Sequence, residues 1–286
     1  MYICKIKHVH SVATTADARG KLLARPGQTG ILAGGTSYIF SQKKELDTLV
    51  DLRPLQLNQI KTEEGGLCIG AMTCLTDLVF DDTVKDYADG ILSRAAHRTG
   101  TTLNRNLCTL GGLLVHPYIW PELATAVLAL NAQLHIYRGT EDQVAAATFY
   151  AQAPAKSLAC GDIVTEISFP SQPDSRRFAF EKYASTHNEF AWLTLAVGAT
   201  LEAGILRDVV IVVGAATPLP RRLPEAEACL EGKTLSKPLL LEAAACASKT
   251  MQTGRDIRCS EQYKRDLCAG MLRGILEETF STTIGK

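Results

Sequence analysis

Within the first fifth of the chain, the spacing of hydrophobic positions changes from a helical period to short apolar runs. This change predicts a small α/β unit. A helical spacing comes first and enters through Thr14 or Thr15, residues that suit a helix N-terminus. Two short apolar runs follow, and the second closes at Arg53-Pro54. We expect a helix over residues 11–25 and strands over residues 29–35 and 47–52. Residues 1–55 therefore predict a helix followed by two strands.

The middle of the chain mixes both periods and contains one stretch with neither. Strands are expected at residues 67–71, 132–139 and 162–170, the last with alternating Ile163, Thr165, Ile167 and Phe169. Helices are expected from Thr73 or Thr76 through "LTDLVF", around residues 84–97, and from Pro121 through "ELATAVLAL". Residues 98–117 are rich in Thr, Asn and Gly, show little periodicity, and predict no regular element.

The last third of the chain predicts a separate antiparallel sheet. The stretch "SQPDS" (171–175) is polar and contains Pro, so it is the best linker candidate and marks the expected domain boundary. Strand-like segments follow at residues 177–183, 191–202 and 205–214, and helical ones at residues 225–232, 237–250 and 260–280. Strands in a run followed by helices in a run predict an α+β arrangement, with helices on one face of the sheet.

Composition and charge exclude several classes of protein. The 286 residues include 30 Lys plus Arg and 30 Asp plus Glu, so the net charge is zero. A nucleic-acid or acidic-membrane binder needs a basic excess, so neither partner is expected. The longest apolar runs are too short to span a bilayer and residues 1–20 hold no secretory signal, so we expect a cytoplasmic protein. None of the nine cysteines is spaced as CxxC, which argues against a disulfide framework, a zinc site and an iron–sulfur ligand set.

Two glycine pairs are the candidate chemistry. The first lies in Ala33-Gly34-Gly35-Thr36-Ser37 and the second in Thr109-Leu110-Gly111-Gly112. Each is either an ordinary tight turn or a backbone cradle for a phosphate, in which successive N–H groups and nearby hydroxyls converge on an anion. Neither matches GxGxxG after a strand or GxxxxGK[ST], so an ordinary Rossmann or P-loop site is not expected. Two such loops together can hold a pyrophosphate from two sides.

Seven motifs in a fixed order give the chain a family resemblance. They are "LAGGTS" (32–37), "LCIGAMTCLTDL" (67–78), "RNLCTLGG" (105–112), "GDIVTEISFP" (161–170), "FEKYAST" (180–186), "VVIVVGAATPLPRR" (209–222) and "DIRCSEQYKR" (256–265). Together they resemble the flavin-binding subunit of molybdenum hydroxylases, such as xanthine dehydrogenase and carbon monoxide dehydrogenase. The resemblance implies an α+β fold in two parts. A two-subdomain FAD-binding domain of the vanillyl-alcohol-oxidase/PCMH type would span residues 1–172, with subdomains 1–55 and 56–172. A C-terminal domain of the CO dehydrogenase flavoprotein type would span residues 173–286.

The same resemblance implies where FAD lies. The cofactor would extend between the two N-terminal subdomains, with the first loop on its pyrophosphate and the second loop closing on it. Lys182 would lie beside the isoalloxazine, where a cation stabilises the anionic reduced flavin; the alternative is a solvated strand lysine. The implied cofactor-binding residues are Ile31, Leu32, Ala33, Gly34, Gly35, Thr36, Ser37, Tyr38, Thr109, Leu110, Gly111, Gly112, Leu113, Glu122, Val164 and Lys182. No catalytic residue and no metal ligand is expected in this chain.

Several positions depart from the family pattern. Leu113 stands where Asn is usual, Cys108 where Gly is usual, and Glu122 where the shorter Asp is usual. Tyr118 and Trp120 occupy a stretch that is normally small and polar, and they can pack on the flavin, on a partner or simply in the core. These changes leave the fold alone but bear on flavin affinity and on the electron acceptor.

The leading hypothesis is an FAD-binding electron-transfer subunit of a molybdenum hydroxylase complex. It would take electrons from [2Fe–2S] clusters on a partner and pass them through FAD to NAD⁺ or another acceptor. The molybdenum cofactor and the clusters would be on other chains, because this chain has no ligand set for them. The alternatives are a flavin-poor structural or assembly subunit with the same fold, and a self-sufficient flavin oxidase, which would need a substrate domain.

Overall fold

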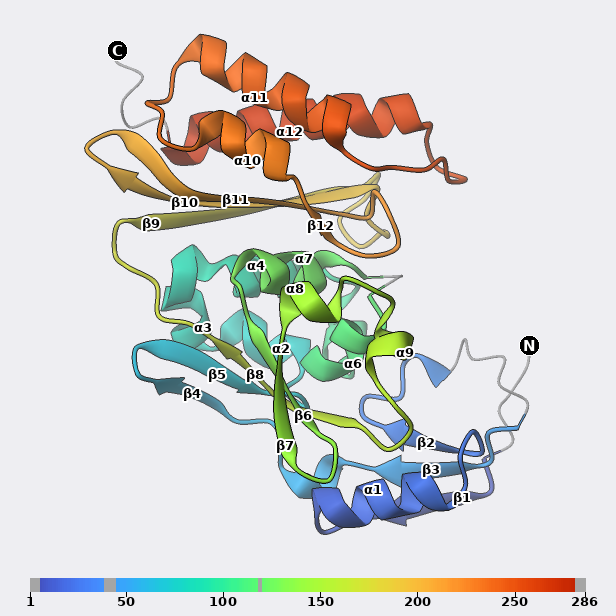
Figure 1. Cartoon of the computed structure of the whole chain (residues 1–286). Helices are drawn as coiled ribbons and strands as arrows, with labels where there is room; N and C mark the ends of the chain where they lie inside the picture. Colours follow the sequence, from blue (N-terminus) through green and yellow to red (C-terminus); the bar gives the residue numbers. More distant parts are fainter. Residues whose placement is uncertain (1–5, 39–44, 118–119, 281–286) are drawn as a thin grey trace.

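Three β-sheets follow one another along the molecule in the computed structural model (Figure 1). The structure describes residues 6–38, 45–117 and 120–280, so Tyr118 lies outside the described residues. Of the helices in that part of the chain, none is both long enough and apolar enough to cross a bilayer. The two N-terminal sheets come from residues before position 170, and the third sheet comes from the residues after it.

The N-terminal sheet has three parallel strands in the order β1-β3-β2. Its elements are β1 (His8–Ser11), α1 (Thr15–Ala24), β2 (Thr29–Leu32), β3 (Thr48–Asp51) and the 3-10 turn η2 (Arg53–Leu55). The Thr14 hydroxyl accepts the Asp17 N–H at 3.1 Å and caps α1, which confirms the predicted helix start. The sequence did not predict β1, because all four of its residues are exposed and carry no apolar alternation.

The middle sheet has five antiparallel strands in the order β4-β5-β8-β6-β7. They are β4 (Ile60–Glu63), β5 (Gly66–Gly70), β6 (Gln133–Tyr137), β7 (Glu141–Ala145) and β8 (Ile163–Phe169). Ile69 and Ile167 are fully buried in one core together with Leu78 and Val127 from the helices. The four predicted core positions of β8 are all buried, which confirms them, and Val164 between two of them is buried as well, so the alternation is not strict.

Short helices cover this sheet. They are α2 (Leu75–Phe80), α3 (Asp82–Asp86), the 3-10 turn η3 (Tyr87–Gly90), α4 (Ile91–His97), α5 (Thr102–Arg105), α6 (Leu110–Val115), α7 (Glu122–Ala129), α8 (Ala146–Phe149) and α9 (Pro154–Ser157). Helices α5 and α6 correct the expectation that residues 98–117 hold no regular element. Their threonine caps, Thr101 and Thr109, start helices too short to show a hydrophobic period. Cys74, and not Thr73 or Thr76, precedes α2.

The C-terminal sheet is antiparallel in the order β12-β11-β10-β9. Its elements are β9 (Arg176–Tyr183), β10 (Leu193–Glu202), β11 (Ile205–Gly214), β12 (Arg221–Arg222), α10 (Pro224–Leu230), α11 (Lys237–Thr250) and α12 (Glu261–Phe280). The three helices lie on one face of the sheet, as predicted, and the other face rests on α4 and α7 (Figure 1). This confirms a mixed helix-and-sheet fold with a C-terminal antiparallel sheet covered by helices.

A left-handed turn fastens the C-terminal sheet to the middle one. Ala88, Asp89 and Gly90 have φ of 51°, 55° and 69°, a costly run for the two residues with side chains. In this turn the Asp89 carboxylate accepts a hydrogen bond of 2.7 Å from the Phe178 N–H of β9. Arg94 donates to the carbonyls of both Asp89 and Phe178. These bonds fix the first strand after the linker against α4.

Candidate functional site

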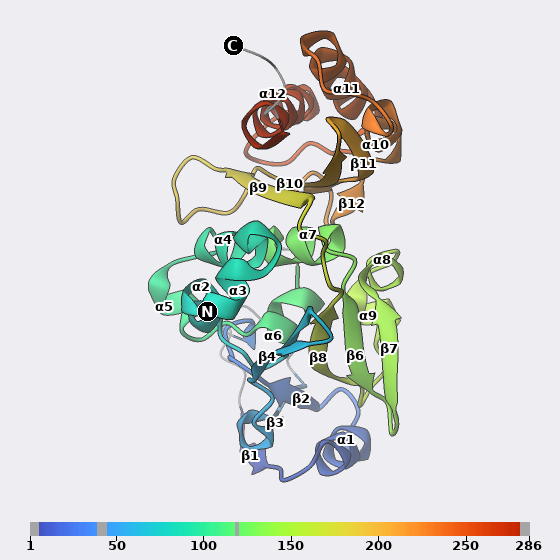
Figure 2. The ribbon, with the colours of Figure 1, turned by 90° about the vertical axis from the view of Figure 1, so that its left-hand side faces the viewer.

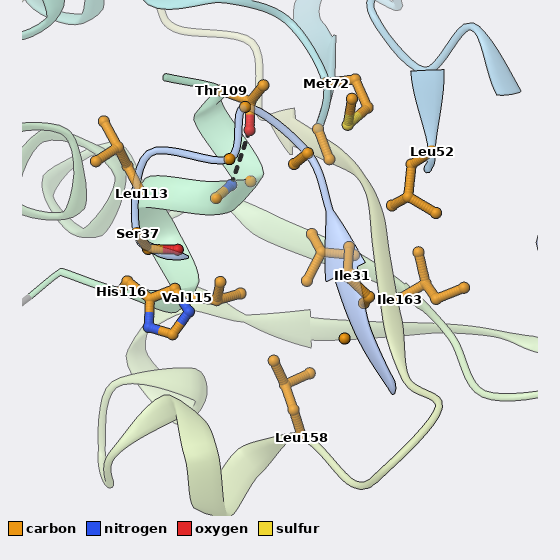
Figure 3. A pocket seen from close by; sticks show the side chains of 18 of the residues that line it. Ile31, Ser37, Leu52, Met72, Thr109, Leu113, Val115, His116, Leu158 and Ile163 are labelled. Carbon is orange, nitrogen blue, oxygen red and sulfur yellow. Dashed lines mark hydrogen bonds between the residues drawn. The ribbon is translucent and has the colours of Figure 1, made fainter. Parts of the chain in front are cut away.

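A cavity of about 370 Å³ opens where the N-terminal sheet meets the middle one (Figure 3). Its size is within the range of small-molecule sites. The two glycine loops both line it, and so does the segment leading into β8. The described lining residues are Leu22, Thr29, Gly30, Ile31, Ala33, Gly34, Gly35, Thr36, Ser37, Tyr38, Leu52, Ala71, Met72, Asn104, Cys108, Thr109, Gly111, Gly112, Leu113, Val115, His116, Trp120, Leu158, Ala159, Cys160, Gly161, Asp162, Ile163 and Val164.

The first loop follows β2, and its backbone donors are unpaired among the residues that the structure describes. Within the described residues, no hydrogen bond has the backbone N–H of residues 33–37 as its donor. Gly35 has φ of +74°, a conformation that turns the chain there and that favours glycine. Residues 33–37 all line the cavity, and their N–H groups can therefore serve an anion.

The second loop is the start of helix α6, and most of its donors are already in use. Gly111 N–H donates to the Ala71 carbonyl at 2.8 Å, and Leu110 N–H to the Thr73 carbonyl at 2.9 Å. The Thr109 hydroxyl accepts the Gly112 N–H at 3.2 Å, the bond drawn in Figure 3. A Cβ on Gly111 would lie 2.7 Å from the Ala71 Cβ, so this glycine allows close packing. The second loop is a structural wall more than a donor set.

The two loops touch directly. A Cβ on Gly34 would lie 1.8 Å from the Leu107 carbonyl oxygen, so only glycine lets the first loop lie on the backbone before the second. Thr36 Oγ1 lies 3.4 Å from Cys108 Sγ and adds a weak hydrogen bond between the loops. Cys108 is buried and faces the cavity.

Apolar side chains form the rest of the wall. Leu52, Met72, Leu158 and Ile163 surround the cavity from four different elements or connections (Figure 3). Sequence reasoning missed these residues, because a single apolar residue carries no motif. Leu22 of α1 and Ile163 of β8 are buried in one apolar core, which hints at this wall. That is a tertiary contact, so the local sequence does not show it. The wall suits a flat, largely apolar ring system beside a polar cradle.

A buried ion pair lies behind Trp120, where α7 meets the C-terminal sheet. Lys182 Nζ lies 2.7 Å from Glu122 Oε1, and both residues are almost fully buried. Lys182 Nζ also donates to the Arg98 carbonyl at 2.7 Å, and lies 5.5 Å from the centre of the Trp120 ring. Burial raises the pKa of the Glu122 carboxyl, and the Lys182 ammonium opposes that rise. The pair thus sits directly behind Trp120, which lines the cavity.

The structure brings most of the predicted site residues together. Twelve of them line the cavity: Ile31, Ala33, Gly34, Gly35, Thr36, Ser37, Tyr38, Thr109, Gly111, Gly112, Leu113 and Val164. Four do not line it: Leu32, Leu110, Glu122 and Lys182. Lys182 is buried at 4% exposure, so it is not a solvated strand lysine. Trp120 and Cys108, which the sequence singled out without assigning them to the site, also line the cavity, and so does His116.

The charge of the lining bears on what can bind. Among the described lining residues there is no Lys or Arg, and the acidic Asp162 is held by Arg138 Nε at 3.2 Å. An anion in this cavity would therefore depend on backbone N–H groups and hydroxyls. A pyrophosphate joined to a flat ring fits that donor set and the apolar wall. In the described part of the chain, no group of three or more His, Cys, Asp and Glu can hold a metal ion.

Comparison with known families identifies the class. A family model described as the FAD binding domain in molybdopterin dehydrogenase matches residues 5–172. One described as the CO dehydrogenase flavoprotein C-terminal domain matches residues 178–279. The chain therefore belongs to the molybdopterin dehydrogenase FAD-binding family, carries an FAD-binding domain, and is of the oxidoreductase class.

Individual relatives agree with that family. The chain is 26% identical to the glyceraldehyde dehydrogenase medium chain of Sulfolobus acidocaldarius, over 86% of this chain and 89% of the relative. It is 28% identical to the carbon monoxide dehydrogenase medium chain of Afipia carboxidovorans, over 94% of each. In the reconstituted CO dehydrogenase from Oligotropha carboxidovorans, a chain of 26% identity superposes with a TM-score of 0.90, covering 98% of this chain and 99% of that one.

Proposed function

We propose that this chain is the FAD-binding electron-transfer subunit of a molybdenum hydroxylase or dehydrogenase complex. It takes electrons from [2Fe–2S] clusters on a partner and passes them to NAD⁺ or another acceptor. The molybdenum cofactor and the clusters are carried by partner chains, as the medium-chain relatives suggest. The observation that carries the proposal is a run of five residues, 33–37, that line the cavity and whose backbone N–H groups have no acceptor among the described residues, in an FAD-binding family member.

The residues of this chain divide the work of holding the cofactor. The N–H groups of residues 33–37 and the Thr36 and Ser37 hydroxyls bind the pyrophosphate. Ile31, Tyr38, Leu113 and Val164 enclose the rest of the molecule and exclude water from it. Gly111, Gly112 and Thr109 form the neighbouring part of the wall, and Leu32 and Leu110 belong to the two loops without lining the cavity. FAD itself supplies the chemistry, the acceptance and release of electrons.

Glu122 and Lys182 act at the flavin end through Trp120. The pair is buried and does not line the cavity, so its charge reaches a bound flavin across the indole ring. Because Glu122 neutralises Lys182, the pair would act on the flavin as a dipole, which favours negative charge on the reduced cofactor when the ammonium is the nearer end. His187 lies near the same pair, and partial desolvation, followed by the nearby cations Arg98 and Lys182, lowers its pKa.

The proposal includes the domain plan and the cellular setting. We propose an FAD domain of the vanillyl-alcohol-oxidase/PCMH type over residues 1–172, with subdomains 1–55 and 56–172, and a second domain over residues 173–286. The ranges of the two family matches and the separate apolar cores support this division. We also propose a cytoplasmic location, in keeping with eight described cysteines that are all free.

Flavin content and ligand competition test the function. The purified full chain should be yellow, with about one FAD per chain. ADP should compete with FAD for the chain, because it carries the same pyrophosphate, and FMN should compete far less. The chain, reduced chemically without oxygen, should be reoxidised by NAD⁺ or by a quinone, and the faster of the two identifies the class of acceptor.

The opposite results have clear meanings. A colourless chain that takes up no added FAD supports a structural or assembly subunit instead. If FMN blocks FAD uptake as well as ADP does, the first loop is not the binding site of the cofactor's pyrophosphate. A flavin-loaded chain that oxidises an organic substrate without any partner would support a self-sufficient oxidase.

A further inference from the structure

The sequence motif "DIRCSEQYKR" (256–265) has no role in the proposed function, and it folds around the Asp256 carboxylate. Asp256 Oδ1 accepts the backbone N–H of Arg258 at 2.7 Å and that of Cys259 at 3.1 Å. Asp256 Oδ2 lies 3.0 Å from Lys264 Nζ and 3.5 Å from the Arg258 guanidinium. Desolvation raises the pKa of Asp256, but these bonds outweigh it and lower the pKa overall, so the carboxylate is charged. We call Asp256, Arg258 and Lys264 the Asp256 hub.

Both cations of the Asp256 hub also bind backbone carbonyls beside the C-terminal sheet. Lys264 is 2% exposed, and its ammonium donates to the Ala215 carbonyl at 3.3 Å, directly after the end of β11. The Arg258 guanidinium donates to the Ala191 carbonyl at 3.3 Å, shortly before the start of β10. The hub therefore joins the segments that flank two neighbouring strands.

The turn after β11 depends on bonds from this part of the chain. Ala215 has φ of +60°, a left-handed conformation that persists for a residue with a side chain only where its surroundings hold it. Lys264 binds the carbonyl of Ala215, and the Thr253 hydroxyl and the Gly254 N–H bind that of Ala216 at 3.3 and 3.4 Å. Three donors thus fix the course of the turn.

The same turn lies against the start of α7. Helices α12 and α7 lie on opposite faces of the C-terminal sheet, so the hub acts on α7 from across the sheet (Figure 2). A Cβ on Gly214 would lie 2.1 Å from Thr125 Oγ1 and 3.5 Å from the Pro121 Cβ, so only glycine allows this approach. Pro121 directly follows Trp120, which lines the flavin cavity. The turn therefore fixes the backbone on one side of Trp120.

Arg258 acts on Trp120 from a second direction. It holds the backbone at Ala191, and the preceding residue, Phe190, packs its ring 4.6 Å from the Trp120 ring. Phe190 is 45% exposed, so a large part of its side chain has no packing partner in the described part of the chain. The bond from Arg258 to Ala191 therefore helps to keep Phe190 on the indole.

We propose that the three residues of the Asp256 hub are positioning residues that set where the Trp120 ring lies in the flavin cavity. Arg258 acts through Phe190, and Lys264 acts through the turn after β11. The hub does not itself line the cavity, so it acts only through these neighbours. A ring held from two directions keeps one orientation, which a binding site needs from the side chains that line it. The inference rests on the proposed function, because that function gives Trp120 its place beside the flavin.

Fluorine NMR of the full chain tests this role. The chain has two tryptophans, so labelling with 5-fluorotryptophan gives two resonances, and Trp192→Phe identifies the one from Trp120. Spectra are recorded without FAD and after FAD is added, for the wild type and for Arg258→Ala. The matched control is Arg265→Ala, which removes an arginine of the same motif that donates to two carbonyls at the end of α11, at 2.7 and 3.2 Å. Urea unfolding gives the stability of each variant.

Arg258→Ala should shift and broaden the Trp120 resonance in the chain without FAD, because the ring then samples more than one orientation. Arg265→Ala should leave that resonance in place even if it lowers stability equally, which a merely structural role would not do. Asp256→Asn keeps an oxygen for the two backbone N–H groups and loses the charge, so it should shift the same resonance and serves if Arg258→Ala does not fold.

An unchanged Trp120 resonance in Arg258→Ala overturns the inference while the proposed function stands. An equal shift in Arg265→Ala overturns it as well, because general loosening of the C-terminal domain would then explain both. A wild-type chain that binds FAD without any change in the Trp120 resonance also overturns it. A wild-type chain that takes up no FAD would instead refute the proposed function, so the failures are distinct.

Discussion

The two glycine loops share a sequence pattern but differ in what their backbones can do. Both place a hydroxyl residue beside Gly-Gly, and both line the same cavity. In the first loop the N–H groups of residues 33–37 have no acceptor within the described residues. In the second loop Gly111 and Gly112 already donate, to Ala71 and Thr109. The same glycine pattern therefore leaves donors available for a ligand in one case and serves close packing in the other, and only the hydrogen bonds tell the two cases apart.

The largest expected effect comes from Gly34→Ala in the first loop. The new Cβ would lie 1.8 Å from the Leu107 oxygen, so the loop must move away from its neighbour. We expect a cost of about 4 kcal/mol, shared between stability and FAD binding, and a rise in the FAD dissociation constant of about 100-fold. Isothermal titration with FAD measures it. The control is Gly20→Ala in α1, with nothing within 4 Å of the new Cβ, which should gain about 0.5–1 kcal/mol. An FAD affinity unchanged in Gly34→Ala would remove the first loop from the site.

Lys182→Met tests whether stability alone accounts for cofactor loss. Removing the ammonium leaves the buried Glu122 carboxylate without its partner, at a cost of about 3 kcal/mol. The loops are untouched, so FAD affinity measured on the folded chain should change by less than about fivefold. The control is Lys61→Met, which breaks an exposed pair with Glu63 and should cost under about 1 kcal/mol. Equal stability losses in the two variants would contradict the burial argument.

The loss in the free energy of unfolding caused by Lys182→Met should depend on pH. The Glu122 pKa in the folded state is already raised by burial, and losing Lys182 raises it further. A carboxyl whose pKa is higher when folded binds its proton more tightly in the folded state. The free energy of unfolding therefore falls as pH rises from the unfolded pKa through the folded one. Urea unfolding between about pH 5 and about pH 8 should show the gap between variant and wild type widening with pH. A constant gap would mean that Glu122 stays charged.

Gly35→Ala separates backbone strain from cofactor loss. Gly35 and Gly27 have nearly the same φ, +74° and +78°, so alanine at either position should cost about 1–2 kcal/mol of stability. Only Gly35 lines the cavity. Gly35→Ala alone should weaken FAD binding, about fivefold to tenfold, while Gly27→Ala leaves it unchanged. Thermal unfolding and FAD titration are measured on both variants. An equal loss of FAD affinity in both would mean that backbone strain alone weakens FAD binding, whether or not the residue lines the cavity.

The smallest effect contrasts the two threonines. Thr109→Val removes the cap that accepts the Gly112 N–H and should cost about 1 kcal/mol of stability, with little change in FAD affinity. Thr36→Val loses only the 3.4 Å contact to Cys108, so stability should hold while FAD affinity falls by about threefold. The urea unfolding midpoint and the FAD dissociation constant, measured on both variants, test this contrast. The reverse pattern would exchange the roles assigned to the two loops.

The sequence predicted the long elements and failed on the short ones, for a physical reason. Helices α11 and α12 and strands β9 to β11 are long enough to show their period. Helices α5 and α6 span four and six residues, so their only local signals are Thr101 and Thr109 as caps. The site followed the same rule. The glycine loops carry a motif, while Leu52 and Met72 reach the cavity only through the packing of distant elements. The Lys182–Glu122 pair joins β9 to α7, a contact that no local pattern encodes.

The two glycine loops also border a second cavity of about 620 Å³, and Ala33, Gly34, Met72 and Thr109 line both spaces. A ligand on one side that stiffens these four residues lowers the ordering cost for an occupant of the other side. Such coupling is reciprocal, so any occupant of the second cavity that stiffens them would raise the affinity for FAD by the factor by which FAD raises the affinity for that occupant.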